Sequence, residues 1–198
     1  MELSSLDQLT ALLQNCKIYL QPWLEVLGAL WVFNIINWLS GSQLNYLGIY
    51  PRSLSGLIGI PLSPILHRNF SHLFFNSIPL FFLGLALLTT KGPIEFCWIT
   101  LVVILLGGCG VWLCGRKSIH IGASGLISGY FGYILTSAYT QPNAITILLA
   151  VMAAYYFGGI FFGIFPGKKE ISWEAHFFGF VSGIGCAYMP NLLLYFIH

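Results

Sequence analysis

Six apolar stretches dominate this sequence, and their lengths limit what it can fold into. A helix that crosses a bilayer needs about 20 mostly apolar residues. Stretches of that character occupy residues 24–40, 71–90, 94–115, 122–138, 144–166 and 174–196. Helix breakers stand between them, for example Gly92-Pro93 and Gln141-Pro142-Asn143. The pattern predicts an all-α membrane protein with six transmembrane helices.

The scarcity of charge argues against a water-soluble domain. Charged residues make up 7% of the 198 residues, whereas a soluble domain carries roughly 25%. So few charges cannot cover a water-facing surface, and lipid must surround most of the chain. The formal net charge of +2, without a basic stripe, gives no reason to expect a nucleic-acid partner.

The chain divides into a polar N-terminal segment and a membrane domain. Residues 1–22 are polar and amphipathic and show no cleavable-signal pattern, and the membrane domain is expected over residues 23–198. Residues 41–70 contain three prolines and are too apolar for a solvated loop. We expect them to form short helices and turns in the membrane interface, between the first and second helices. The other connections are short, which predicts one compact bundle of antiparallel neighbours.

Four polar residues stand at the starts of the even-numbered stretches. His72 and Asn76 lie in the first turns of the second stretch, Ser124 begins the fourth, and His176 begins the sixth. Polar groups inside a membrane are functional candidates, because a charge there costs about 2.5 to 3.5 kcal/mol. Even-numbered helices enter from the same side. The four side chains are therefore expected at one end of the bundle, at similar depth.

Ser124 is the candidate nucleophile. It lies between Gly122 and Gly125, and these glycines allow a sharp turn that leaves backbone N–H groups beside the hydroxyl. A serine nucleophile needs such donors to stabilise the oxyanion formed when it attacks a carbonyl. The alternative is that Ser124 only caps its helix.

His176 is the candidate base. Gly179 and Gly183 share its helix face at small-xxx-small spacing, which lets this helix pack closely against the helix of Gly125. That packing would bring Ser124 within reach of His176, as activated serine chemistry requires. No carboxylate is placed to complete a triad, so a dyad is expected. The alternative for His176 is a hydrogen-bonding role at the interface.

Further polar groups accompany this pair. His72 and Asn76 are four residues apart on one helix face, and both can donate hydrogen bonds to an oxyanion. Polar contact between helices is an equally good explanation. His67 and His120 are assigned loop-anchoring or interfacial roles, with His120 as the weaker candidate base.

Other protease chemistries lack their residues. The sequence contains no H-E-x-x-H pattern, and its five cysteines do not have zinc-site spacing, so no metal is expected. The apolar stretches contain no aspartate, which excludes a membrane aspartyl dyad.

Three motifs together resemble the rhomboid family. Residues 67–76 resemble its H-x4-H-x3-N segment, residues 122–125 its G-x-S-G, and residues 175–183 its A-H-x2-G-x3-G. They fall in order on helices two, four and six of a six-helix chain. The resemblance covers about residues 41–185.

This resemblance implies a rhomboid-type serine endopeptidase without a cofactor. Ser124 would be the nucleophile and His176 the general base. His72, Asn76 and the Ser124 backbone would form the oxyanion hole, with Gly122 shaping the loop. Family members cleave transmembrane protein substrates near the membrane surface. The fifth helix and the loop after it would be the lateral gate.

The sequence departs from the family pattern in two places. Many members carry a Trp-Arg pair in the long first loop, where this chain has Arg52 after Pro51, and an aromatic residue commonly stands at the position of Ser128 and stacks on the catalytic histidine. The alternative is therefore a catalytically inactive rhomboid-like protein that binds transmembrane clients. A small transporter would need a continuous polar path, for which Asn34 and Asn37 are the only obvious extra polar groups.

The charge distribution bears on the orientation in the membrane. Family orientation, with the N-terminus cytoplasmic, leaves Lys17 and Lys91 inside and puts six basic residues outside: Arg52, Arg68, Arg116, Lys117, Lys168 and Lys169. This reverses the positive-inside rule. We favour the family orientation because the first loop is expected to be embedded. The expected location is a bacterial inner membrane.

Overall fold

The computed structural model describes residues 5–166 and 172–189, and these residues are overwhelmingly helical. The α-helices are α1 (Ser5–Leu39), α2 (Leu54–Leu62), α3 (Phe70–Val102), α4 (Gly108–Cys114), α5 (Ser124–Thr140), α6 (Ala144–Phe157), α7 (Gly159–Phe162) and α8 (Trp173–Ala187). Short 3₁₀ turns η1 (Gln43–Leu47) and η2 (Ser63–Ile65) and a π-helical turn η3 (Val103–Gly107) complete the described elements. The described residues form no strand, only an isolated bridge between Ile49 and His120. The all-α prediction is confirmed.

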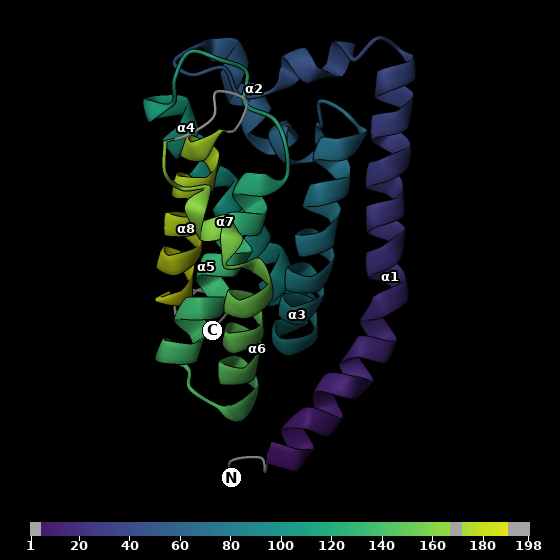
Figure 1. Cartoon of the computed structure of the whole chain (residues 1–198), viewed down its shortest axis with the longest axis vertical. Coiled ribbons are helices and arrows are strands. Elements are labelled where there is room, and N and C mark those ends of the chain that lie inside the picture. The colour runs from purple at the N-terminus through teal and green to yellow at the C-terminus, as the bar shows by residue number, and fades with distance from the viewer. Residues whose placement is uncertain (1–4, 167–171, 190–198) are drawn as a thin grey trace.

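Two helical runs, Leu6–Leu39 and Phe70–Cys114, are long and apolar enough to cross a membrane. The second run bends at Gly92, whose φ of 73° and ψ of 169° interrupt the helix. Glycine adopts such positive φ values without steric cost. The chain therefore descends along the first part of α3 and returns to the starting end at α4 (Figure 1). The bend falls at the breaker between the expected stretches 71–90 and 94–115.

The remaining described helices are shorter than the stretches expected from the sequence. The expected stretch 144–166 is divided at Gly158 into α6 and α7. The expected stretch 174–196 continues past the described residues, so only its first part is seen as α8. The polar segment expected over residues 1–22 lies at the N-terminus. Its described part belongs to α1, which continues through Pro22.

The segment between α1 and α3 lies at one end of the bundle and contains η1, α2 and η2, as expected for short helices and turns (Figure 1). Buried Asn34 ties it to α1: its side chain donates to the Ile65 carbonyl oxygen at 2.9 Å and accepts the His67 backbone N–H at 2.9 Å. Arg52 ties it to α4, because its guanidinium donates to the Leu113 carbonyl oxygen at 2.9 Å. Asn34 therefore holds the loop rather than lining a polar path.

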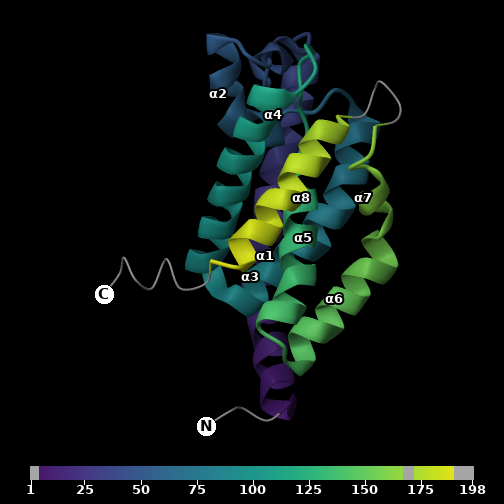
Figure 2. The same cartoon turned by 90° about the vertical axis from the view of Figure 1, so that its left-hand side faces the viewer.

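α5 is the central helix, and nine of its 17 residues are buried. α8 crosses it closely (Figure 2). A β-carbon added to Gly179 would collide with the Gly125 carbonyl oxygen, and one added to Gly183 with the Gly129 carbonyl oxygen. The expected small-residue packing of the two helices is confirmed. The outer surface is rich in exposed apolar side chains, such as Val32 on α1, which suits a lipid environment.

Candidate active site

α3, α5 and α8 begin at the same end of the bundle (Figure 1). A pocket of about 700 Å³ is lined by residues at these helix starts. Its lining includes His72, Asn76, Ser124 and His176. The four polar residues selected from the sequence therefore share one cavity, as their positions at the starts of even-numbered stretches predict.

Ser124 is the first residue of α5 and follows a backbone turn at Gly122, whose φ is 118°. A β-carbon on Gly122 would lie 2.6 Å from His72 Nε2 and 3.4 Å from Asn76 Nδ2. Only glycine fits there, both for its φ and for the space available. The turn thus places the imidazole of His72 and the amide of Asn76 beside the backbone that leads into Ser124.

Both neighbours of this turn present hydrogen-bond donors. The Arg68 backbone N–H donates to His72 Nδ1 through a long hydrogen bond of 3.5 Å, which puts the ring proton of neutral His72 on Nε2. Asn76 Nδ2 is buried and has no hydrogen-bond partner among the described residues. Leaving a buried donor unpaired costs roughly 1–3 kcal/mol. An unpaired donor of this kind fits a site that binds a hydrogen-bond acceptor of a ligand.

His176 is oriented by the backbone of its own helix. Its Nδ1 lies 2.9 Å from the Ser172 carbonyl oxygen, which can only accept a hydrogen bond. Nδ1 therefore carries the proton, and Nε2 keeps its lone pair. Gly163, just after α7, lies against this ring, since a β-carbon there would be 3.2 Å from Nε2.

Ser124 and His176 share the pocket without a hydrogen bond between them among the described contacts. The start of α8 nevertheless packs against the start of α5, because a β-carbon on Gly125 would lie 3.1 Å from the Ala175 carbonyl oxygen. Catalytic hydrogen bonds are often long in unliganded enzymes and tighten when substrate binds. Ser124 and His176 thus lie at the starts of two packed helices and line the same pocket.

His67 lies behind the pocket and is fully buried. Its Nε2 accepts the Ala123 backbone N–H at 3.3 Å, and its carbonyl oxygen accepts the Trp38 indole N–H at 2.8 Å. These are the contacts of a loop anchor. Burial, and next the nearby His72, lower the pKa of His67 to about 3, which keeps its ring neutral.

His120 has no free ring nitrogen. Nδ1 lies 2.6 Å from Ser172 Oγ, and Nε2 lies 3.0 Å from the Arg116 carbonyl oxygen. This full occupancy favours His176 over His120 as the base. Within residues 5–166 and 172–189, no three His, Cys, Asp or Glu side chains gather as a metal site would require.

Sequence reasoning overlooked three residues near the site. Ser172 orients His176, and Arg116 pairs with the buried carboxylate of Glu174, with Nε 3.5 Å from Oε1. The available signal was Ser172 itself, a serine three residues before Ala175, which is typical of a helix N-cap. Its hydroxyl indeed accepts the Ala175 N–H at 3.3 Å.

Ser128, which stands where the rhomboid family commonly has an aromatic residue, is fully buried. Its hydroxyl has no hydrogen-bond partner among the described residues. Within the same part of the chain, no aromatic ring stacks on His176. The Ser172 carbonyl therefore supplies the orienting contact instead.

Comparison with known proteins gives matches along most of the chain. Residues 54–190 match the family model of the Rhomboid domain. An uncharacterised protein of Mycobacterium tuberculosis is 36% identical over 175 residues, covering 84% of this chain and 72% of its own. A second, from Mycobacterium leprae, is 32% identical, covering 84% and 69%. A Bacillus subtilis protein described as a candidate rhomboid protease, YdcA, is 36% identical over 76 residues, covering 37% and 38%.

Proposed function

Since this chain belongs to the rhomboid family, we propose that it is an intramembrane serine protease in which Ser124 and His176 form the catalytic dyad. One observation carries the proposal. The hydrogen bond from His176 Nδ1 to the Ser172 carbonyl oxygen leaves Nε2 unprotonated in the same pocket as Ser124. A neutral imidazole in this tautomer is the general base that a serine nucleophile needs.

The reaction would proceed by acyl transfer. Ser124 Oγ attacks the scissile carbonyl carbon while its proton moves to His176 Nε2. His176 then donates this proton to the leaving amine as the peptide C–N bond breaks. Water hydrolyses the acyl-enzyme in the second half, with His176 again accepting and returning a proton. The products are a new carboxylate and a new amine.

The oxyanion of each tetrahedral intermediate would be stabilised by three donors. His72 Nε2 and Asn76 Nδ2 lie beside Gly122, and the Ser124 backbone N–H belongs to the start of α5, where helical N–H groups have no partner within the helix. Removing one oxyanion donor typically costs on the order of 10²–10³ in rate.

In the membrane, we assign six crossings. They are α1, the two parts of residues 70–114 before and after the bend at Gly92, α5, α6 together with α7, and α8. The pocket would face the extracytoplasmic side of a bacterial inner membrane, with the N-terminus cytoplasmic. The bacterial relatives and the family topology support this placement. A reporter fused to the C-terminus that reads extracytoplasmic would contradict it.

The substrates would be transmembrane segments of other proteins. An apolar hollow of about 740 Å³ lies between α1, α3 and α6, with Phe82, Met152 and Phe157 in its lining. Such a surface suits a helix that arrives through the lipid. The gate proposed at the end of the fifth crossing includes residues 167–171, which lie outside the described residues.

Labelling by a fluorophosphonate probe tests the proposal. The purified, detergent-solubilised protein should be labelled, whereas Ser124→Ala and His176→Ala should not be. Ser71→Ala is the matched control, because Ser71 lines the same pocket without a catalytic assignment, and it should keep full labelling. Cleavage of a transmembrane substrate should follow the same order.

An inactive, client-binding protein is the alternative, and the absence of an aromatic ring on His176 among the described residues is the observation that favours it. A folded wild-type protein that is not labelled, yet still retains a transmembrane peptide in detergent, would support this function and overturn the protease.

A further inference from the structure

Two contacts tie the loop that precedes Ser124 to the first turn of α8. In this loop, residues 115–123, His120 Nδ1 lies 2.6 Å from Ser172 Oγ. In addition, the Arg116 backbone N–H donates to the Glu174 carboxylate at 3.2 Å. The loop leads into the proposed nucleophile, and the first turn of α8 carries the proposed base. The two ties therefore join the two halves of the dyad.

The direction of the His120 contact follows from its other nitrogen. His120 Nε2 lies 3.0 Å from the Arg116 carbonyl oxygen, which only accepts, so Nε2 carries the ring proton. Nδ1 of the neutral ring is then an acceptor, and the Ser172 hydroxyl donates to it. Burial lowers the pKa of His120, which keeps the ring neutral at pH 7.

Ser172 contacts both His120 and His176. Its hydroxyl accepts the Ala175 backbone N–H at 3.3 Å while donating its proton to His120. Its carbonyl oxygen accepts His176 Nδ1 at 2.9 Å and the His176 backbone N–H at 3.3 Å. A change in the position of Ser172 would therefore turn the imidazole of His176.

His120 is itself held in place. Its backbone N–H donates to the Ile49 carbonyl oxygen at 2.9 Å, and its carbonyl oxygen accepts the Ile49 N–H at 3.0 Å. His120 is 3% exposed, and both of its ring nitrogens have polar contacts. It is a fixed reference point four residues before Ser124.

We propose that His120 and Ser172 are positioning residues that set the direction of His176 Nε2 relative to Ser124. The proposal rests on the dyad proposed above. In a triad a carboxylate holds the histidine, but no carboxylate contacts the His176 ring among the described residues. The chain from His120 through Ser172 to His176 performs that task. Misplacement of a reacting group by about 1 Å can cost 10²-fold in rate.

Two replacements of His120 separate positioning from loop anchoring. His120→Asn puts its amide oxygen near the place of Nδ1 and keeps an acceptor for Ser172. His120→Gln puts its amide nitrogen near the place of Nε2 and keeps only the donor to the Arg116 carbonyl oxygen. We expect kcat for a transmembrane substrate to stay within about 3-fold of wild type in His120→Asn. In His120→Gln it should fall by about 10- to 100-fold with KM unchanged.

Equal kcat values in the two variants at equal thermal stability, or a higher value in His120→Gln, would overturn the positioning role. Should either variant fail to fold, the comparison of Ser172→Thr with Ser172→Ala takes its place. The threonine keeps the hydroxyl and should keep kcat, whereas the alanine should lower it. A lower kcat in both variants would overturn the proposal. Wild-type protein that is not labelled at Ser124 would instead refute the protease function, so the two failures are distinguishable.

Discussion

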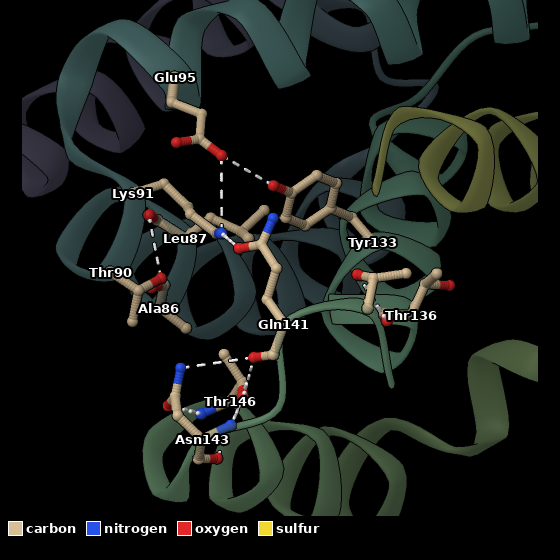
Figure 3. Close-up of polar contacts among 11 residues, drawn as sticks. Ala86, Leu87, Thr90, Lys91, Glu95, Tyr133, Thr136, Gln141, Asn143 and Thr146 are labelled. Atoms are coloured by element: carbon tan, nitrogen blue, oxygen red, sulfur yellow. Dashed lines mark hydrogen bonds and ion pairs between the residues drawn. The ribbon is translucent and has the colours of Figure 1, made fainter. Parts of the chain in front are cut away.

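Two polar clusters lie at opposite ends of the bundle, and they differ in whether their polar groups are paired. At the pocket, Asn76 Nδ2 is buried without a partner among the described residues. At the other end, the side chains of Lys91, Glu95, Tyr133 and Gln141 satisfy one another (Figure 3). Lys91 Nζ lies 2.7 Å from Gln141 Oε1 and 3.6 Å from Glu95 Oε1, and the Tyr133 hydroxyl donates to Glu95 at 2.9 Å.

The difference indicates what each cluster is for. Polar groups near a membrane are costly unless they are paired. The Lys91 cluster joins the bend within α3 to α5 and to the turn before α6. Its side chains pair with one another, which explains the cluster as structural. The pocket instead keeps a donor unpaired beside open space. The polar groups at one end bond to one another, whereas the unpaired donor at the other end fits a site that binds an acceptor from a ligand.

Asn76→Ala tests this contrast with the largest expected effect. We expect kcat to fall by about 10²–10³-fold, because an oxyanion donor is lost. The free energy of unfolding should hardly change, because Asn76 Nδ2 has no partner to lose. Substrate cleavage and thermal stability in detergent measure the two quantities.

Asn15→Ala is the matched control. Its amide donates to the Thr89 carbonyl oxygen at 2.8 Å, away from the pocket. This variant should lose stability and keep kcat. If Asn76→Ala lost stability and kept kcat as well, Asn76 would be a packing residue and the contrast would fail.

Lowering the pH should reduce the free energy of unfolding through protonation of His67, behind the pocket. Burial lowers the folded-state pKa of His67 to about 3, against 6.5 for an ordinary histidine. As pH falls, His67 is therefore protonated in the unfolded chain before it is protonated in the folded protein. Neutral His67 costs no free energy of unfolding above pH 6.5, and the free energy of unfolding decreases as pH falls from 6.5 toward 3. The loss approaches about 1.4 kcal/mol per pH unit, or about 2–3 kcal/mol between pH 6.5 and 4.5.

Unfolding measured in detergent across this range checks the prediction. His67→Gln is the control, because a glutamine oxygen can accept the Ala123 N–H in place of Nε2 but binds no proton. Its stability should depend less on pH over this window. An equal pH dependence in both proteins would assign the effect to another group, with His72 the first to examine.

The space around His176 offers a smaller test. A β-carbon on Gly163 would lie 2.9 Å from His176 Cδ2, whereas one on Gly159 would meet nothing within 4 Å. We expect Gly163→Ala to lower kcat by about 10-fold by displacing the ring, and Gly159→Ala to leave it unchanged. Equal kcat values in both variants would show that the ring can move away without consequence.

The sequence predicted the features that depend on local pattern. The apolar stretches predicted the all-α fold, although only two helical runs are long and apolar enough to cross a membrane. Gly92-Pro93 predicted the bend, and the starts of the even-numbered stretches predicted that Ser124 and His176 lie at one pocket. Glycine spacing likewise predicted the crossing of α5 and α8. In each case the signal lies within a few neighbouring residues or follows from counting crossings.

The contacts missed from the sequence join residues far apart in the chain. His120 meets Ser172, and Arg116 meets Glu174, only because α4 ends at the same place where α5 and α8 begin. The continuity of α1 through Pro22 was missed for another reason. A proline inside a helix removes one backbone hydrogen bond, yet α1 runs from Ser5 to Leu39 with Pro22 inside it.

The Lys91 cluster yields the smallest expected effect and completes the contrast. Lys91→Met keeps the length of the side chain and removes its contacts with Gln141, Glu95 and the face of Tyr133, whose ring centre lies 5.6 Å from Nζ. Glu95 keeps its hydrogen bond from Tyr133, so the loss of stability should be only about 1 kcal/mol. The kcat of the folded protein should stay unchanged, because nothing in the pocket contacts this cluster. A lower kcat at full folding would mean that the two ends are coupled through α5, and the division between a structural end and a reactive end would have to be abandoned.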